Sequence, residues 1–357
     1  MKTAFYDPER SYYENYEAGP FGSFARTSPL VREDEPREVF LGLKVHTRFG
    51  IPAGPLLHGG YVKAALDKGF DLPVYKTVRT GAHSCHEYPN VLPVDVTGNL
   101  TLEKADEGLV TKDAYTEPLS ITNSFGVPSY KPDEWQPDAA AAVAHAKEGQ
   151  LVGVSFQGTH THEQSPQEYI DDWVAAAKLA ADTKAHFLEA NLSCPNEGTT
   201  ALLCFDIDRV IQIARKIKDA IGDVPLLLKI SYFTDDEALQ DLVKRTGSIV
   251  DGYATINTIS AEVRTPDGEQ ALPGDGRLRS GVCGAAIKWA GLDMVQRFAA
   301  HREKYNKDFA VVGVGGVIAT ADYEEYLSAG ADAVMSATGA MWNPELGEEV
   351  FRSRETN

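Results

Sequence analysis

The segment Asn191-Leu192-Ser193-Cys194-Pro195-Asn196 has the residue types best suited to chemistry, and it follows an apolar, strand-like run. Its two carboxamides can each donate and accept hydrogen bonds, which suits a planar ligand rich in amides. The Cys194 thiol between them could act as a base or a nucleophile, and Pro195 restricts Cys194 to extended geometry. A lone cysteine is more commonly a buried structural residue. The flanking asparagines favour a chemical role over packing.

Two lysines, Lys76 and Lys229, end apolar strand-like runs, where a surface lysine is not expected. Either side chain could run along the apolar surface to reach solvent, or could form half of an ion pair. Two ammonium groups at matching strand ends suit a different role. They favour an anionic ligand, or a cofactor that acquires negative charge.

The glycine-rich turn Gly313-Val314-Gly315-Gly316 follows another apolar run and precedes a helix-like stretch. Glycines let the backbone approach an anion, and free N–H groups at a helix start favour phosphate. Ile318 stands where the dinucleotide fingerprint has its last glycine, so the turn does not match that motif and could be an ordinary tight turn. Ala337-Thr338-Gly339 ends the next run. Two consecutive strand ends are therefore equipped to bind phosphate.

Strand-like and helix-like stretches alternate along the chain and must position these groups. The expected strands span residues 50–53, 74–77, 151–156, 187–192, 225–230, 252–256, 310–314 and 333–336. The expected helices span residues 62–68, 138–147, 167–183, 206–221, 235–246, 285–301 and 321–329. Near-continuously apolar strands are typical of parallel strands covered on both faces. The alternation predicts an α/β fold, a (β/α)8 TIM barrel, with an open doubly wound sheet as the alternative.

Two segments interrupt this alternation. Residues 1–46 precede the first strand and are expected to form an N-terminal extension that packs on the barrel of residues 47–357. Residues 80–137 form a long insertion after the second strand. An insertion of that length is more commonly functional than an ordinary loop.

Composition limits the partners and the compartment. The 357 residues include 52 acidic and 34 basic side chains, a net charge of −18, which disfavours nucleic acid and anionic membranes. The N-terminus has no apolar signal segment, and no run approaches the roughly 20 apolar residues that cross a bilayer. Four cysteines in a chain this long do not form a disulfide scaffold. These features predict a cytoplasmic protein.

The segment His83-Ser84-Cys85-His86 has residue types that bind zinc. A structural zinc site needs four ligands, and no second pair of spaced cysteines or histidines supports one. We expect no metal.

Together these residues resemble the dihydroorotate dehydrogenase family of flavin mononucleotide (FMN) barrels, from about Gly50 to Trp342. The Asn-Leu-Ser-Cys-Pro-Asn segment is similar to that of the soluble class, in which the base is a cysteine. Three features depart from the family. Residues 87–94 lack the arginine of a common Gly-Asn-Pro-x-Pro-Arg element, and Phe125 replaces a commonly smaller or more flexible residue. The N-terminal extension is also longer than in typical soluble members.

The resemblance implies a role for each site residue. The catalytic residues would be Cys194 as the base, Lys76 near substrate and flavin, and Lys229 near the flavin pyrimidine. The substrate-binding residues would be Lys76, Asn123, Phe125, Gly126, Val127, Asn191, Asn196, Asn257 and Thr258. The FMN-binding residues would be Ala53, Gly54, Lys76, Thr77, Ser155, Asn191, Lys229, Asn257, Gly281, Gly315, Gly316, Ala337 and Thr338.

The implied reaction is the oxidation of dihydroorotate to orotate in pyrimidine biosynthesis, with hydride transfer to the flavin. Soluble relatives suggest a homodimer, and the electron acceptor could be fumarate, a quinone, or NAD through a partner subunit. Three alternatives stay open: a flavin oxidoreductase for another pyrimidine such as dihydrouracil or dihydrothymine, a non-redox barrel for sugar phosphates, and a flavin-binding module without catalysis.

Overall fold

A ring of eight parallel strands forms the centre of the molecule. The computed structural model describes residues 5–25, 28–161, 163–193 and 202–355. The strand order is β3-β15-β14-β11-β10-β9-β8-β4. The strands are β3 (Phe49–Gly50), β4 (Val74–Val78), β8 (Gly153–Phe156), β9 (Phe187–Asn191), β10 (Leu226–Ile230), β11 (Gly252–Thr255), β14 (Ala310–Val314) and β15 (Ala333–Met335).

The two end strands of that sheet are joined through the chain that leaves β3. The Val74 N–H donates to the Ile51 carbonyl at 2.9 Å, and the Asp71 N–H donates to the Phe49 carbonyl at 2.9 Å. These bonds bring β4 beside the chain after β3 and nearly close the ring. The predicted (β/α)8 barrel is confirmed, and the open doubly wound alternative is wrong.

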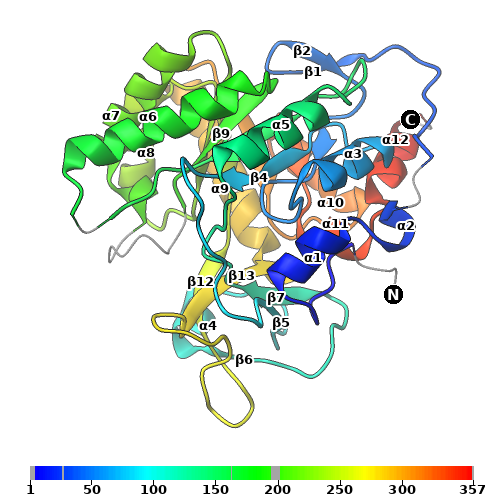
Figure 1. Cartoon of the computed structure of the whole chain (residues 1–357), viewed down its shortest axis with the longest axis vertical. Coiled ribbons are helices and arrows are strands. Elements are labelled where there is room, and N and C mark those ends of the chain that lie inside the picture. The colour runs from blue at the N-terminus through cyan, green and yellow to red at the C-terminus, as the bar shows by residue number, and fades with distance from the viewer. Residues whose placement is uncertain (1–4, 26–27, 162, 194–201, 356–357) are drawn as a thin grey trace.

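Helices surround the ring, as Figure 1 shows. They are α3 (Gly59–Asp67), α5 (Pro132–Val143), α6 (Pro166–Asp182), α7 (Ile207–Ile221), α8 (Asp236–Thr246), α9 (Lys288–Lys304), α10 (Thr320–Ser328), α11 (Thr338–Trp342) and α12 (Leu346–Glu355). Short 3-10 turns precede α7 at Leu203–Phe205 and α9 at Ala285–Ile287. Helix α6 illustrates the local cause: Ser165 and Glu168 form a capping box, and Pro166 occupies the first turn.

Helix α5 differs from the predicted helix of residues 138–147. It begins at Pro132 and carries Pro137 in its interior. Proline disfavours a helix interior, which is why the sequence predicts a helix only after Pro137. Packing outweighs that local cost here, since Trp135, Ala139 and Ala142 of α5 are buried.

The barrel interior has an apolar lower part and a polar upper part. Phe187, Leu227, Ala254, Val312 and Met335 belong to one buried cluster. Side chains alternate across a strand, so Glu189 and Asn191 share the inward face of Phe187, and Lys229 shares that of Leu227. Because the period of a strand is two, the side chains of Glu189, Asn191 and Lys229 all point into the barrel near its carboxyl end.

Residues ahead of the barrel contact both of its ends. This segment forms α1 (Tyr12–Ala18), α2 (Gly22–Ala25), β1 (Glu38–Phe40) and β2 (Leu43–Val45). The Phe40 ring lies 5.9 Å from that of Phe187, at the start of β9. The Tyr12 ring lies 6.2 Å from that of Phe125, at the carboxyl ends of the strands. A buried ion pair of 2.6 Å joins Arg32 to Asp71.

A second sheet projects from the carboxyl end of the barrel (Figure 1). Its order is β5-β7-β13-β12-β6. The elements are β5 (Val91–Pro93), α4 (Leu102–Glu107), β6 (Leu109–Val110), β7 (Ser120–Asn123), β12 (Ile259–Arg264) and β13 (Arg279–Gly284). The insertion after β4 supplies β5, β6 and β7, whereas an insertion after β11 supplies β12 and β13. The sequence did not indicate the second contribution.

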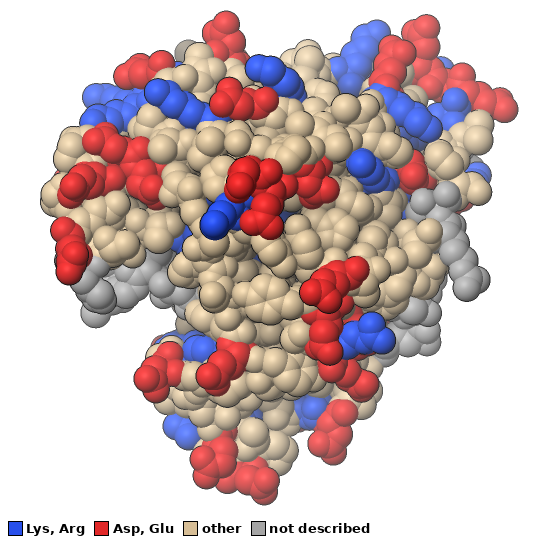
Figure 2. Space-filling view, in the orientation of Figure 1, with Lys and Arg blue, Asp and Glu red and all other residues tan. Residues whose placement is uncertain are grey.

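The surface reflects the acidic composition. Figure 2 shows acidic side chains spread over the face in view, with basic ones interspersed and no continuous basic area. Within the four described ranges, no helix is long and apolar enough to cross a lipid bilayer.

Candidate active site

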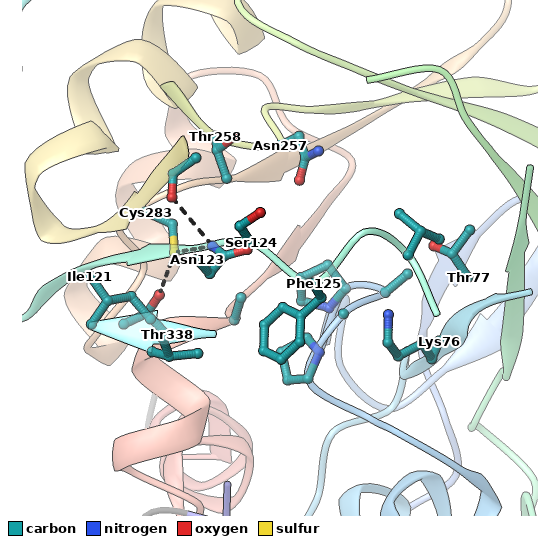
Figure 3. A pocket seen from close by; sticks show the side chains of 18 of the residues that line it. Lys76, Thr77, Ile121, Asn123, Ser124, Phe125, Asn257, Thr258, Cys283 and Thr338 are labelled. Carbon is teal, nitrogen blue, oxygen red and sulfur yellow. Dashed lines mark hydrogen bonds between the residues drawn. The ribbon is translucent and has the colours of Figure 1, made fainter. Parts of the chain in front are cut away.

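One cavity lies where the carboxyl ends of the barrel strands meet the second sheet. Fifteen of the predicted site residues line it: Ala53, Gly54, Lys76, Thr77, Asn123, Phe125, Gly126, Val127, Asn191, Lys229, Asn257, Thr258, Gly281, Ala337 and Thr338. Figure 3 shows Lys76 and Thr77 on one side of it, with Cys283 and Thr338 on the other. Segments far apart in sequence thus converge on one pocket.

Three of the predicted residues have other positions. Gly315 and Gly316 line a smaller adjoining cavity, which shares Ala337 and Thr338 with the main one. Ser155 is fully buried, and its hydroxyl lies 3.0 Å from that of Thr77. Ser155 therefore lies behind a cavity residue and not on the cavity wall. Cys194 and Asn196 fall outside the described residues.

Lys229 is buried at the end of β10. Its Nζ donates to the Ala53 carbonyl at 3.0 Å and lies 3.8 Å from a Glu189 carboxylate oxygen. The carbonyl and the carboxylate fix the ammonium at the cavity wall, which gives the pocket a buried positive group.

Lys76 reaches the cavity from β4. Its side chain is 7% exposed, and its Nζ lies 5.9 Å from the centre of the Tyr12 ring. A ring face attracts a cation at about this separation. Helix α1, which carries Tyr12, thereby closes over the lysine and keeps its charge inside the pocket.

Asn123, at the end of β7, belongs to a small network on the opposite wall. Its Nδ2 approaches the Gly281 carbonyl at 3.5 Å and Cys283 Sγ at 3.4 Å, while Thr338 Oγ1 donates to the same sulfur at 3.3 Å (Figure 3). Burial raises the pKa of the Cys283 thiol. The thiol is thus a neutral link between Asn123, which lines the cavity, and Thr338, at the start of α11.

Asn191, which ends β9, and Asn257, which follows β11, are joined through Ser193. Asn257 Nδ2 donates to the Ser193 carbonyl at 3.0 Å, and Ser193 Oγ lies 3.3 Å from the Asn191 side-chain carboxamide. Both carboxamides line the cavity. Together with Asn123, they give it donors and acceptors for a polar planar ligand.

The turn after β14 and the chain before α11 form a cradle of backbone donors. Among the described residues, the N–H groups of Gly315, Gly316, Ala337 and Thr338 donate to no backbone or side-chain acceptor. Gly316 has φ +66°, and a Cβ there would lie 2.6 Å from that of Lys288. Free amides at a glycine turn fit a phosphate group. The residues present therefore fit a cofactor with a phosphate at this end and a planar ring toward Lys229.

Two cavity residues were missed by sequence reasoning. Tyr6 comes from the N-terminal extension, and its buried hydroxyl has no hydrogen-bond partner in the described ranges. Nothing in the sequence marked it. Cys283 lies two residues after the predicted Gly281, and the period of a strand could have placed it on the same face.

The zinc-like segment lies behind the cavity wall, where it contacts Ser124, a residue that lines the cavity. His83 pairs with Ser129 through backbone bonds, and His86 Nδ1 lies 3.1 Å from Ser124 Oγ. In the part of the chain that is described, no group of three His, Cys, Asp or Glu side chains could hold a metal ion.

Comparisons with known proteins identify the family of the chain. The family model described as dihydroorotate dehydrogenase matches residues 98–352. Dihydroorotate dehydrogenase of Dictyostelium discoideum is 35% identical over 99% of this chain and 98% of its own length. The catalytic subunit of dihydroorotate dehydrogenase B (NAD(+)) of Staphylococcus carnosus is 30% identical over 58% of this chain and 72% of its own length.

A solved structure has the same fold. The structure of dihydroorotate dehydrogenase from Eimeria tenella, in complex with ferulenol, superposes with a TM-score of 0.70 at 18% identity, over 90% of this chain and 84% of that one. The solved structure shows only a shared fold, whereas the family match and the near full-length relative show family membership. The chain belongs to the dihydroorotate dehydrogenase family.

Proposed function

We propose that the protein oxidises dihydroorotate to orotate with a bound FMN. The observation that carries this proposal is the convergence of Lys76, Asn123, Asn191, Asn257 and Lys229 on one cavity, in a chain related along its whole length to a dihydroorotate dehydrogenase. The family depends on flavin in general. FMN, which carries one phosphate, suits the cradle of free amides at Gly315, Gly316, Ala337 and Thr338.

The substrate is an anion with a planar amide edge. Asn123, Asn191 and Asn257, with Asn196, would hold that edge, while the Lys76 ammonium would attract the carboxylate. Phe125 and Gly126 line the same wall and shape the substrate side. Asn191 and Lys76 are buried, which makes their contacts stronger than they would be in water.

The proposed reaction removes a proton and a hydride from the substrate. Cys194 would take the proton that leaves C5 of dihydroorotate, which requires a thiolate or a readily deprotonated thiol. The chemistry that a flavin would supply in this cavity is acceptance of the hydride that leaves C6. Lys229 would hold a fixed positive charge beside the ring, where negative charge then develops.

Two measurements on purified protein test the proposal. Heat-released flavin should be FMN and not FAD, in near-equimolar amount with the protein. Dihydroorotate should be consumed and dihydrouracil should not, because only dihydroorotate has the carboxylate that Lys76 attracts. Turnover with dihydrouracil alone would support another pyrimidine. A colourless protein that binds no flavin would remove the redox function.

The same preparation tests the finer proposals. We infer a homodimer from the soluble relatives, and sedimentation of the holoenzyme measures it directly. Fumarate, a quinone and NAD are compared as acceptors in the same assay. Turnover with NAD only after a second polypeptide is added would identify an electron-transfer subunit.

A further inference from the structure

Asn191 is held from behind by two buried residues, Gln157 and Arg79. Gln157 has no exposed surface, Arg79 is 3% exposed, and Asn191 is 6% exposed. As placed, Asn191 Nδ2 donates to Gln157 Oε1 at 3.0 Å. That orientation turns the Gln157 NH2 group toward the guanidinium of Arg79, so donors face donors.

Chemistry fixes how this chain of groups must be oriented. A guanidinium has only donors, so the Gln157 oxygen must face Arg79. Turned that way, this oxygen accepts from Arg79 Nη2 at 2.6 Å and from Nη1 at 3.1 Å. The Gln157 NH2 group then faces Asn191, which must present its own oxygen there. The Asn191 NH2 group is left facing Ser193 Oγ and the cavity.

Arg79 cannot easily turn away, because other buried acceptors hold it. Its Nε donates to the Val127 carbonyl at 3.1 Å, and its Nη1 donates to the Gly158 carbonyl and to Thr159 Oγ1, both at 3.1 Å. Val127 belongs to the loop that lines the substrate side of the cavity. The Arg79 guanidinium thus anchors that loop. It also fixes which way the Gln157 and Asn191 carboxamides are turned.

We propose that Arg79 and Gln157 are positioning residues that fix Asn191 as a hydrogen-bond donor toward the substrate. The site would then select a ligand edge that presents an acceptor, such as a ring carbonyl oxygen, over the same edge with an amino group. The proposal rests on the proposed function for the identity of the substrate. The orientation of the amides follows from the protein alone.

Gln157→Glu should reverse which end of the Asn191 carboxamide faces the cavity, while the shape of residue 157 stays nearly constant. The new carboxylate accepts from Arg79 but has no donor for Asn191, so Asn191 must donate to that carboxylate and turn its own oxygen toward the cavity. The probes are orotate and its two analogues in which one ring carbonyl is replaced by an amino group. Their dissociation constants are measured from the absorbance change of the bound flavin in the full-length holoenzyme.

Wild type should prefer orotate over both analogues. For each analogue the readout is the ratio of its dissociation constant to that of orotate. In Gln157→Glu this ratio should fall at least tenfold for one of the two analogues. Gln157→Met and Arg79→Met leave Asn191 free to turn, so both should shift the ratio less. Flavin content and melting temperature show which variants are folded. A merely structural role would weaken all three ligands together and leave the ratio unchanged.

An unchanged ratio in folded Gln157→Glu would overturn the proposal. If that variant does not fold, an unchanged ratio in Arg79→Met has the same meaning. Wild type that binds none of the three ligands would count against the proposed function instead. A neutron structure then decides the orientation directly: Gln157 nitrogen toward Asn191 supports the proposal, and Gln157 oxygen toward Asn191 contradicts it.

Discussion

The Lys229 ammonium lies 3.8 Å from a Glu189 carboxylate oxygen, inside the barrel and directly behind the cavity. Both side chains are buried, and neither Glu189 oxygen has a hydrogen-bond partner among the described residues. Buried charges are screened much less than exposed ones. The Glu189 charge therefore acts on whatever binds beside Lys229, and it partly offsets the positive field there.

Glu189→Gln should raise the midpoint potential of the bound flavin. The change removes a negative charge at nearly constant shape, so the charge added on reduction meets less repulsion. A spectroscopic redox titration measures the potential. Glu269→Gln, an exposed glutamate in the β12–β13 loop, is the control for the loss of one net charge. Equal potentials in wild type and Glu189→Gln would show that this carboxylate does not influence the flavin.

Gly315→Asp should give a folded but colourless protein. The new carboxylate would stand at the cradle of free amides and repel a phosphate, and Gly315 has φ +127°, which L side chains rarely adopt. Gly222→Asp is a control for placing Asp at a glycine of positive φ, because Gly222 has φ +63° at the end of α7 with open space around it. Flavin absorbance relative to protein is the readout. Full flavin occupancy in Gly315→Asp would place the phosphate elsewhere.

Tyr6→Phe should leave the flavin-free protein as stable as wild type or slightly more stable. The Tyr6 hydroxyl is buried without a partner in the described ranges, and an unsatisfied polar group costs about 1–3 kcal/mol. If that hydroxyl instead serves a ligand in the cavity, the variant should bind orotate more weakly. Melting curves with and without orotate separate the two effects. A large loss of stability in the flavin-free variant would mean that the hydroxyl has a structural partner.

Alkylation should single out Cys194. Burial raises the pKa of Cys85 to about 11 and that of Cys204 to about 12, and it also raises the pKa of Cys283. At pH 7.5 a thiol with a pKa of about 11 is less than about 0.1% thiolate, so these three partly or fully buried thiols should react slowly. A base must ionise more readily, so iodoacetamide should label Cys194 first, and orotate should protect it. Mass spectrometry of tryptic peptides measures the order in which the cysteines are alkylated. Preferential labelling of another cysteine would argue against Cys194 as the base.

Strand ends were the part of the site that the sequence could predict. An apolar run that stops at Lys76, Asn191 or Lys229 indicates a strand. Because the period of a strand is two, the run also indicates that its last side chain points into the barrel. Parallel strands bring such ends together. The barrel and the cavity walls built from those ends follow from that rule.

The second sheet and the supporting residues could not be predicted in the same way. Strands β12 and β13 pair with each other, and β13 pairs with β7, which lies more than a hundred residues earlier. No local sequence pattern indicates a pairing over that distance. Tyr6 reaches the cavity only because the N-terminal extension, with α1, folds over Lys76. Arg79 and Gln157 look like ordinary residues beyond strand ends until their distance to Asn191 is known. Long-range packing decides all of these.

The most direct test of the account is anaerobic mixing of the flavin-loaded protein with dihydroorotate, in wild type and in Cys194→Ala. In wild type we predict rapid loss of the oxidised-flavin absorbance, with an equimolar yield of orotate. Positioned general bases contribute about 10²–10⁴-fold, so the alanine variant should bind orotate but lose its flavin colour slower by that factor. A wild-type flavin that dithionite reduces and dihydroorotate does not would contradict the proposed function.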